Sequence, residues 1–210
     1  MEPVILVVVA FILVYALLYR AHHIPHPRRA LLVHPRPMNL PPLYKLDHII
    51  DNVWLGDWGD SITPQKLILN NIKVIVTLNS ELIHSYFDVA IFKGLGIAHV
   101  RIDIEDSRRA NIAPHLRELV GYLVGAGRSG LNVLVHCSAG ISRSSSVVIA
   151  YLMEVSDVSY DTALAHVQGI RPIVQPNPSF ERQLREYGSA LQGQGGIANT
   201  PHIKIIRDTS

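Results

Sequence analysis

The single cysteine of this 210-residue chain lies in residues 136–144, which read HCSAGISRS. An apolar run at 131–135 precedes this segment and predicts a buried strand, and an apolar run at 145–153 follows it and predicts a buried helix. A cysteine at such a junction faces the free N–H groups and the positive dipole end of the first helical turn. Both favour a thiolate, and both also form a site for an anion.

Arg143 adds a second group suited to oxyanion chemistry. Its guanidinium is a planar fork that can donate to two oxygens of one phosphoryl group, which a lysine cannot do. The pattern therefore predicts a thiolate, Cys137, that attacks phosphorus. An inert, buried cysteine is the ordinary alternative for a lone Cys, but it leaves the flanking His136, Gly140 and Arg143 unexplained.

Displacement at phosphorus needs an acid that protonates the leaving oxygen. Three carboxylates compete in residues 101–112 (RIDIEDSRRANI): Asp103, Glu105 and Asp106. The alternation over 100–104 predicts a strand, which places Asp103 and Glu105 on the strand or at its end. Asp106 opens the loop that follows. Because a loop can carry a side chain over a site, Asp106 is the preferred acid and Asp103 is the reserve.

The spacing His-Cys-x5-Arg-Ser resembles the signature of the cysteine-dependent protein phosphatases, and the flanking VHCSAGISRS and AYLM resemble the dual-specificity subgroup. The resemblance extends over about residues 43–190, through VWLG at 53–56, IKVIVTLN at 72–79 and RPIVQPNPSF at 171–180. Asp106, followed by Asn111-Ile112-Ala113, fits the acid of that family. The resemblance thus supports Asp106 over its neighbours.

The resemblance also implies roles for the other residues. Ser144 would help the thiol leave a phosphocysteine intermediate, although Ser144 to Ser146 could instead cap a helix. His136 would hydrogen-bond to the loop and stabilise the thiolate, and Asn177 would support the loop from outside. No further ligand stands at metal-binding spacing near Cys137, so neither a metal nor another cofactor is expected. The phosphate would be held by the loop itself: Ser138, Ala139, Gly140, Ile141, Ser142 and Arg143.

The residues between Cys137 and Arg143 carry no charge. Relatives that hydrolyse phosphoinositides or RNA triphosphates place basic residues in or near this loop, so the expected substrates are proteins bearing phosphotyrosine and phosphoserine/threonine. Nucleic acid is not an expected partner. Two alternatives stay open: a phospholipid phosphatase at a membrane, and a catalytically silent module that binds phosphoproteins.

Strand-like runs alternate with helix-like runs at 64–70, 114–124, 160–166 and 180–191. This order predicts an α/β domain over 43–190, with a central, mostly parallel, twisted sheet flanked by helices, as in the dual-specificity phosphatases. Residues 191–210 are rich in Gly and polar side chains at first and predict a flexible tail.

Residues 4–19 (VILVVVAFILVYALLY) contain no charge and form a short but workable membrane span. Residues 1–19 are therefore predicted to be a transmembrane signal-anchor helix. A cleavable signal peptide is the alternative, but Glu2 replaces the usual basic start and no small-residue cleavage site follows.

Residues 20–42 form a linker with four arginines, six prolines and four histidines. Beyond residue 36 the chain holds 15 basic and 16 acidic residues, so the formal charge of +2 comes from this linker. A basic flank predicts a single-pass protein whose catalytic domain faces the cytosol, at the endoplasmic reticulum or outer mitochondrial membrane. The linker could contact anionic lipids or act as a plain solvated tether. A reducing compartment also suits a lone reactive cysteine.

Overall fold

The computed structural model describes residues 43, 45–79 and 85–193. The predicted anchor (1–19), the linker (20–42) and the tail beyond residue 193 lie outside the described residues. In the part of the chain that the structure describes, no helix is both long enough and apolar enough to cross a membrane.

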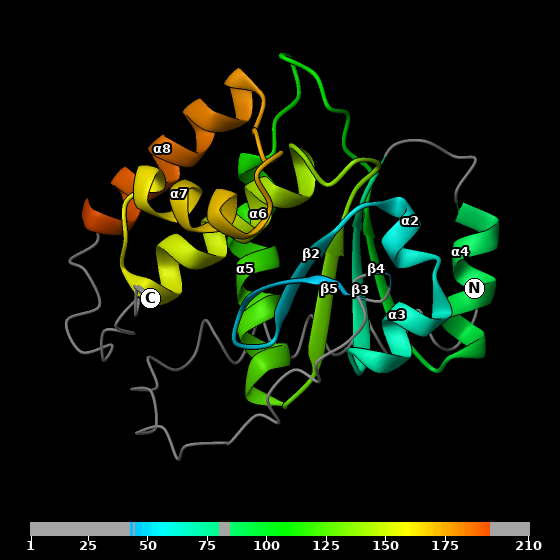
Figure 1. The fold of residues 1–210 in the computed structure, drawn as a ribbon. Coiled ribbons are helices and arrows are strands. Elements are labelled where there is room, and N and C mark those ends of the chain that lie inside the picture. The colour runs from blue at the N-terminus through cyan, green and yellow to red at the C-terminus, as the bar shows by residue number, and fades with distance from the viewer. Residues whose placement is uncertain (1–42, 44, 80–84, 194–210) are drawn as a thin grey trace. The chain divides into compact units, whose positions relative to one another are not determined.

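Five strands form one sheet in the order β1-β2-β5-β3-β4 (Figure 1). Strand β1 is antiparallel to β2, and the other neighbouring pairs are parallel. The prediction of a mostly parallel α/β sheet is thereby confirmed. The bounds are β1 Asp47–Ile50, β2 Val53–Gly56, β3 Ile72–Leu78, β4 Ala98–Ile102 and β5 Asn132–His136.

Helices cover both faces of the sheet (Figure 1). One face carries three helices: α2 (Trp58–Ser61), α3 (Pro64–Leu69) and α4 (Ser85–Gly94). The other face carries four: α5 (Ala113–Arg128), α6 (Arg143–Ser156), α7 (Tyr160–Ile170) and α8 (Pro178–Gly193). Two layers of side chains are therefore buried, one on each side of the strands.

Helix α6 is the centre of the larger layer. Every residue from Arg143 to Met153 is buried, because α6 contacts α5, α7, α8 and the sheet. A helix that is apolar on all sides is expected in such a position. Strand β5, which leads to α6, lies between β2 and β3 and is buried from Val133 to His136. The segment with the cysteine thus connects two deeply buried elements.

Some element ends differ from the sequence-based expectation. Strand β4 ends at Ile102, where its partner β3 also ends, so Asp103 lies just beyond the strand. The pairing partner, and not the alternation of side chains, sets the strand's length. Helix α8 continues to Gly193, past the expected end of the domain at 190. Helix α6 begins already at Arg143, and Ser144 therefore lies in its first turn.

Leu123 on α5 is completely buried in the larger layer. We expect Leu123→Ala to lower the free energy of unfolding by about 2 to 5 kcal/mol, since it removes apolar contacts and leaves a cavity. Ile68 on α3 is 62% exposed, and Ile68→Ala should change the same quantity by less than about 0.5 kcal/mol. Urea unfolding measures both, and equal effects would contradict the assignment of the core.

Candidate active site

Cys137 directly follows β5, and its side chain is buried at the bottom of the turn into α6. The residue is 1% exposed. Two donors point at its Sγ: the backbone N–H of Gly140 at 3.3 Å and the hydroxyl of Ser144 at 3.2 Å. Both donors stabilise a negatively charged sulfur.

The carbonyl groups of the loop are held from outside by other parts of the chain. The N–H of Trp58, at the start of α2, donates to the oxygen of Ser138 at 3.1 Å. The N–H of Gln175 donates to the oxygen of Ile141 at 2.9 Å. Segments before and after the loop in sequence therefore fix its backbone.

Arg171 holds the middle of the loop. Its Nη2 donates to the oxygen of Ala139 and its Nε donates to the oxygen of Gly140, each at 3.1 Å. The guanidinium also pairs with Asp47 at 2.8 Å and Asp57 at 3.4 Å. Burial disfavours the charge, but the hydrogen bond to Asp47 and the nearby carboxylates raise the pKa of Arg171 above its ordinary value.

Serine hydroxyls hold the end of the loop. Ser145 Oγ donates to the oxygens of Ile141 and Ser142 at 2.6 and 2.9 Å, and Ser146 Oγ donates to Ser142 at 2.7 Å. Ser144 Oγ donates to Cys137 Sγ, and all three serines lie inside the helix, so the capping role considered for Ser144 to Ser146 is wrong. Ser142 occupies the N-cap position itself, yet its side chain makes no capping hydrogen bond.

Because each carbonyl from Ser138 to Ser142 is held outward, the following N–H groups point inward. Oxygen and hydrogen lie on opposite sides of a trans peptide plane, and no cis peptide bond occurs among the described residues. The N–H groups of Ala139 to Arg143 therefore line a cradle above Sγ, beside the N-terminus of α6. Such a cradle suits a tetrahedral oxyanion.

Gly140 is required by this geometry. Its φ of +66° is a conformation that favours glycine. A Cβ at this position would also lie 2.6 Å from the oxygen of Gly56 and 2.7 Å from Arg171 Nη2. Only a glycine allows the loop to approach β2 and Arg171 so closely.

Arg143 is buried beneath the cradle, with 4% of its surface exposed. Its Nη1 donates to the oxygen of Ile104 at 3.3 Å, and its Nη2 donates to Ser138 Oγ at 3.0 Å. The guanidinium is therefore held in place by both the acid-bearing segment and the loop.

Asp106 reaches the edge of the cradle, as preferred from sequence. Its Oδ1 accepts hydrogen bonds from Ser142 Oγ and Asn177 Nδ2, each at 2.8 Å, and its Oδ2 lies 3.8 Å from Arg143 Nε. Its side chain keeps 34% exposure and remains accessible from the solvent. An acid in this position can reach an atom bound in the cradle.

No hydrogen bond or ion pair among the described residues joins Asp103 or Glu105 to the loop. Asp103 accepts from Arg101 Nε at 2.7 Å, and its side chain is 68% exposed. Glu105 is exposed as well. The structure thus separates the preferred acid from the reserve.

Asn177 contacts the end of the loop, as expected of a supporting residue, and it also binds Asp106 and the start of α8. Its backbone N–H donates to Ser142 Oγ at 3.1 Å, and its side-chain oxygen accepts from the N–H groups of Ser179 and Phe180 at the start of α8. Its side chain positions Asp106 and caps α8, while Arg171 holds the loop carbonyls. Sequence reasoning did not assign Arg171, although that residue opens the segment singled out as the loop's support.

His136 is completely buried and contacts the loop as expected, with Nδ1 3.3 Å from the oxygen of Cys137. Its Nε2 lies 2.7 Å from Thr77 Oγ1, which in turn lies 2.8 Å from His99 Nε2. Sequence reasoning missed Thr77 and His99. A signal was present, since Thr77 is a polar residue within the apolar run of β3.

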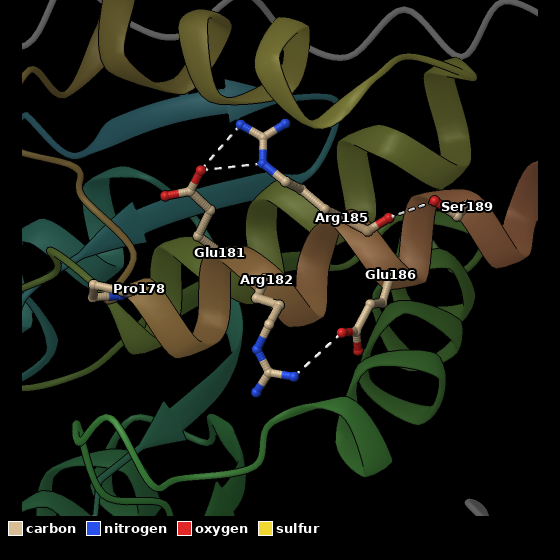
Figure 2. A pocket seen from close by; sticks show the side chains of 6 residues that line it. All are labelled: Pro178, Glu181, Arg182, Arg185, Glu186 and Ser189. Atoms are coloured by element: carbon tan, nitrogen blue, oxygen red, sulfur yellow. Dashed lines mark hydrogen bonds and ion pairs between the residues drawn. The ribbon is translucent and has the colours of Figure 1, made fainter.

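Two hollows lie near this end of the molecule. One of about 510 Å³ adjoins Asp106, Ser142 and Asn177 and extends to Tyr160 and Glu181. The other, of about 350 Å³, lies along the outer surface of α8, where charged side chains pair with one another (Figure 2). None of the predicted catalytic residues lines the second hollow. Within the described ranges, no group of three His, Cys, Asp or Glu is placed to hold a metal ion.

We expect Arg171→Met to weaken binding of a tetrahedral oxyanion, such as tungstate, by about tenfold or more. The carbonyls of Ala139 and Gly140 would lose their donors and could turn inward, where they repel an anion. Arg182→Met on α8 is the matched control, because Arg182 is 67% exposed and pairs only at the surface with Glu186. Isothermal titration calorimetry measures both affinities, and an unchanged affinity for Arg171→Met would contradict the role.

Comparison with known proteins agrees with this geometry. Residues 53–190 match the family model described as dual specificity phosphatase, catalytic domain. Dual specificity protein phosphatase 15 of Rattus norvegicus is 35% identical over 142 residues, covering 68% of this chain and 57% of the rat protein. Protein phosphatase Slingshot homolog 3 of Homo sapiens is 31% identical over 168 residues, covering 75% of this chain and 24% of the human protein.

The fold is similar to that of solved relatives. The crystal structure of human DUSP28 matches with a TM-score of 0.63 at 27% identity, covering 73% of this chain and 97% of that chain. The present chain spans little more than half the length of the rat relative and a quarter of the Slingshot homologue. The family match, the relatives and the fold lead to one conclusion: the chain belongs to the dual-specificity phosphatase family, and residues 53–190 match its catalytic domain.

Proposed function

We propose that this protein is a membrane-anchored dual-specificity protein phosphatase that works through a phosphocysteine intermediate. The observation that carries the proposal is the cradle of inward N–H groups, which has Cys137 Sγ at its floor and Asp106 at its edge. A nucleophile, an oxyanion site and an acid thus lie around one position that a phosphoryl group can occupy.

In the first step, the Cys137 thiolate attacks phosphorus while the loop N–H groups and Arg143 hold the equatorial oxygens. A P–S bond forms and the P–O bond to the substrate breaks. Asp106 gives its proton to the departing oxygen, which leaves as an alcohol or phenol. Preorganised donors stabilise the charge on the equatorial oxygens without having to reorganise.

In the second step, water attacks the phosphocysteine. Asp106, now a carboxylate, accepts a proton from that water, the P–S bond breaks and inorganic phosphate forms. Ser144 Oγ lies 3.2 Å from Sγ and donates to the sulfur as the negative charge returns to it. The hydroxyl therefore makes the thiolate a better leaving group.

Phosphoproteins are the proposed substrates. No charged residue stands between Cys137 and Arg143, so the cradle has a place for one phosphate and no extra partner for a polyphosphorylated headgroup. The hollow of about 510 Å³ beside Asp106 offers room for the polypeptide that carries the phosphate. Membership in the family supports activity on phosphotyrosine and on phosphoserine/threonine.

The anchor is proposed from the sequence of residues 4–19. The arginines of residues 20–42 favour a cytosolic catalytic domain, and the short span suits the endoplasmic reticulum or the outer mitochondrial membrane. The same arginines would bring the linker to anionic lipids.

Two other functions are separated by experiment. A phospholipid phosphatase would release phosphate from lipid vesicles and not from phosphopeptides. A silent phosphoprotein-binding module would release none from either, and its cellular role would survive Cys137→Ser. Both remain less favoured, because the cradle is uncharged and because Cys137, Arg143 and Asp106 are all present.

Phosphate release from phosphotyrosine and phosphothreonine peptides tests the mechanism. We expect Cys137→Ser to reduce turnover to background and Asp106→Asn to slow it by about a hundredfold or more, since proton donation to the leaving group is lost. Asp103→Asn is the matched control: it alters an exposed carboxylate three residues away and should leave turnover within about twofold of wild type. A larger loss for Asp103→Asn than for Asp106→Asn would reverse the assignment of the acid.

Membrane attachment is tested in the full chain by Val9→Arg with Ile12→Arg. Each arginine near the centre of a span costs about 2.5 to 3.5 kcal/mol of insertion free energy, so the double variant should move from the carbonate-resistant membrane fraction to the soluble fraction. The control, Val9→Leu with Ile12→Leu, should stay in the membrane. Release of wild-type protein by carbonate would show that no span is inserted.

A further inference from the structure

A buried chain of hydrogen bonds crosses three neighbouring parallel strands and ends at the loop. It runs from His99 on β4 to Thr77 on β3 at 2.8 Å, from Thr77 to His136 on β5 at 2.7 Å, and from His136 Nδ1 to the oxygen of Cys137 at 3.3 Å. The resemblance to the phosphatase family implied a supporting role for His136 next to the nucleophile, but the proposed reaction assigns nothing to Thr77 or His99.

The hydrogen-bond chain lies on the sheet face that α4 covers. Thr77 pairs in register with His136, and the ring of His99 packs edge-on against Phe92 of α4 with 4.9 Å between centroids. Thr77 is 2% exposed and His136 is completely buried, so each polar atom there depends on its protein partners.

Thr77 has one hydroxyl proton to share between two imidazole rings. It can donate to one ring only, and it must accept from the other if both contacts are hydrogen bonds. His136 Nδ1 faces a carbonyl oxygen, which accepts and never donates, so that nitrogen carries a proton. The variable proton of His136 is therefore the one at Nε2, facing Thr77.

The hydrogen-bond chain therefore has two arrangements in which every contact is a hydrogen bond. When His136 is neutral, Thr77 donates to its Nε2 and His99 donates Nε2–H to Thr77. When His136 is an imidazolium, its Nε2–H donates to Thr77, the hydroxyl rotates, and Thr77 donates to the bare Nε2 of His99. His99 can serve in both because a neutral imidazole offers either a donor or an acceptor at Nε2. Its ring is partly exposed and can exchange the other proton with water.

His99 must stay neutral for both arrangements to exist. Burial, and then the charge of Arg101, lower the pKa of His99 to about 4, so the ring is neutral at physiological pH. Arg101 is itself paired with Asp103. On the other side of His136, beyond Gly56 of β2, the carboxylates of Asp57 and Asp60 pair with Arg171 and Lys66.

We propose that His99 is a positioning residue which, through Thr77, keeps the hydrogen bonds of His136 complete in both protonation states and thereby supports the thiolate of Cys137. This inference rests on the proposed function. An imidazolium at His136 stabilises the neighbouring thiolate of Cys137. In that state the Thr77 hydroxyl accepts from His136, so the hydroxyl proton points away from His136 and needs another acceptor, which is Nε2 of His99. A side chain at position 99 without that acceptor would leave the buried Thr77 hydroxyl unsatisfied and would disfavour the imidazolium form of His136.

Alkylation by iodoacetamide across the acidic-to-neutral pH range tests the proposal directly. The chain has one cysteine, so the label reports on Cys137 alone. We expect His99→Phe to move the midpoint of the rate–pH profile up by about one unit, which slows alkylation about tenfold at low pH. His99→Gln offers an amide that can donate or accept, and it should restore most of the wild-type profile.

Thr77→Val should give the same shift as His99→Phe, and the double variant should shift no further, because both changes interrupt one chain. His166→Phe is the matched control, since it removes another partly buried imidazole, one bonded to the oxygen of Ile49 on β1, and should leave the midpoint unchanged. An unmoved midpoint for both His99→Phe and Thr77→Val, or shifts that simply add, would overturn the proposal. Alkylation needs no turnover, so this result stands apart from any failure of phosphopeptide hydrolysis.

Discussion

A trans peptide plane places its oxygen and its N–H on opposite sides, and the phosphate loop depends on this constraint. A row of N–H groups can converge on one point only if hydrogen-bond donors elsewhere in the fold hold the loop's carbonyl groups on the outer side. Here the donors are Trp58, Arg171, Gln175 and the serines at the start of α6, which come from three different parts of the chain. The tertiary fold is therefore what gives the loop its chemistry, since the isolated sequence HCSAGISRS would have no reason to turn its carbonyls outward.

Most of the residues proposed to touch the reacting atoms could be identified from the sequence, because they lie close together along the chain. Cys137, Arg143 and Ser144 fall within one strand–helix junction, where the apolar runs on either side already predict the turn and the helix N-terminus. Asp106 could be preferred because a loop acid is more adaptable than one on a strand. The α/β class followed from the alternation of runs. Local pattern and chemistry were enough for Cys137, Arg143 and the α/β class, whereas the role of Ser144 and the support for Asp106 also drew on the resemblance to the phosphatase family.

The supporting residues could not be found in this way, because their partners are distant in sequence. Arg171 contacts Asp47 and the loop, and its role appears only when β1, α2 and the loop are brought to one end of the sheet. Thr77 contacts His136, and His99 contacts Thr77, because the strand order is β5-β3-β4, which no periodicity reveals. Asn177 was expected to support the loop and does contact Ser142, but its side-chain bonds to Asp106 and to the start of α8 could not be foreseen. Strand order and long-range pairing carry the information that the sequence pattern lacks.

Ser142 stands where a capping residue should be, but it gives its hydroxyl to Asp106. The most deeply buried helix of the described domain therefore begins without a side-chain cap, directly after the loop N–H groups that line the cradle. In the proposed function, a phosphoryl group held in the cradle would lie at the N-terminus of α6 and interact favourably with the positive end of its dipole. A ligand that binds this cradle only in the folded domain would stabilise the fold, so that occupancy of the site and stability of the domain would be thermodynamically linked.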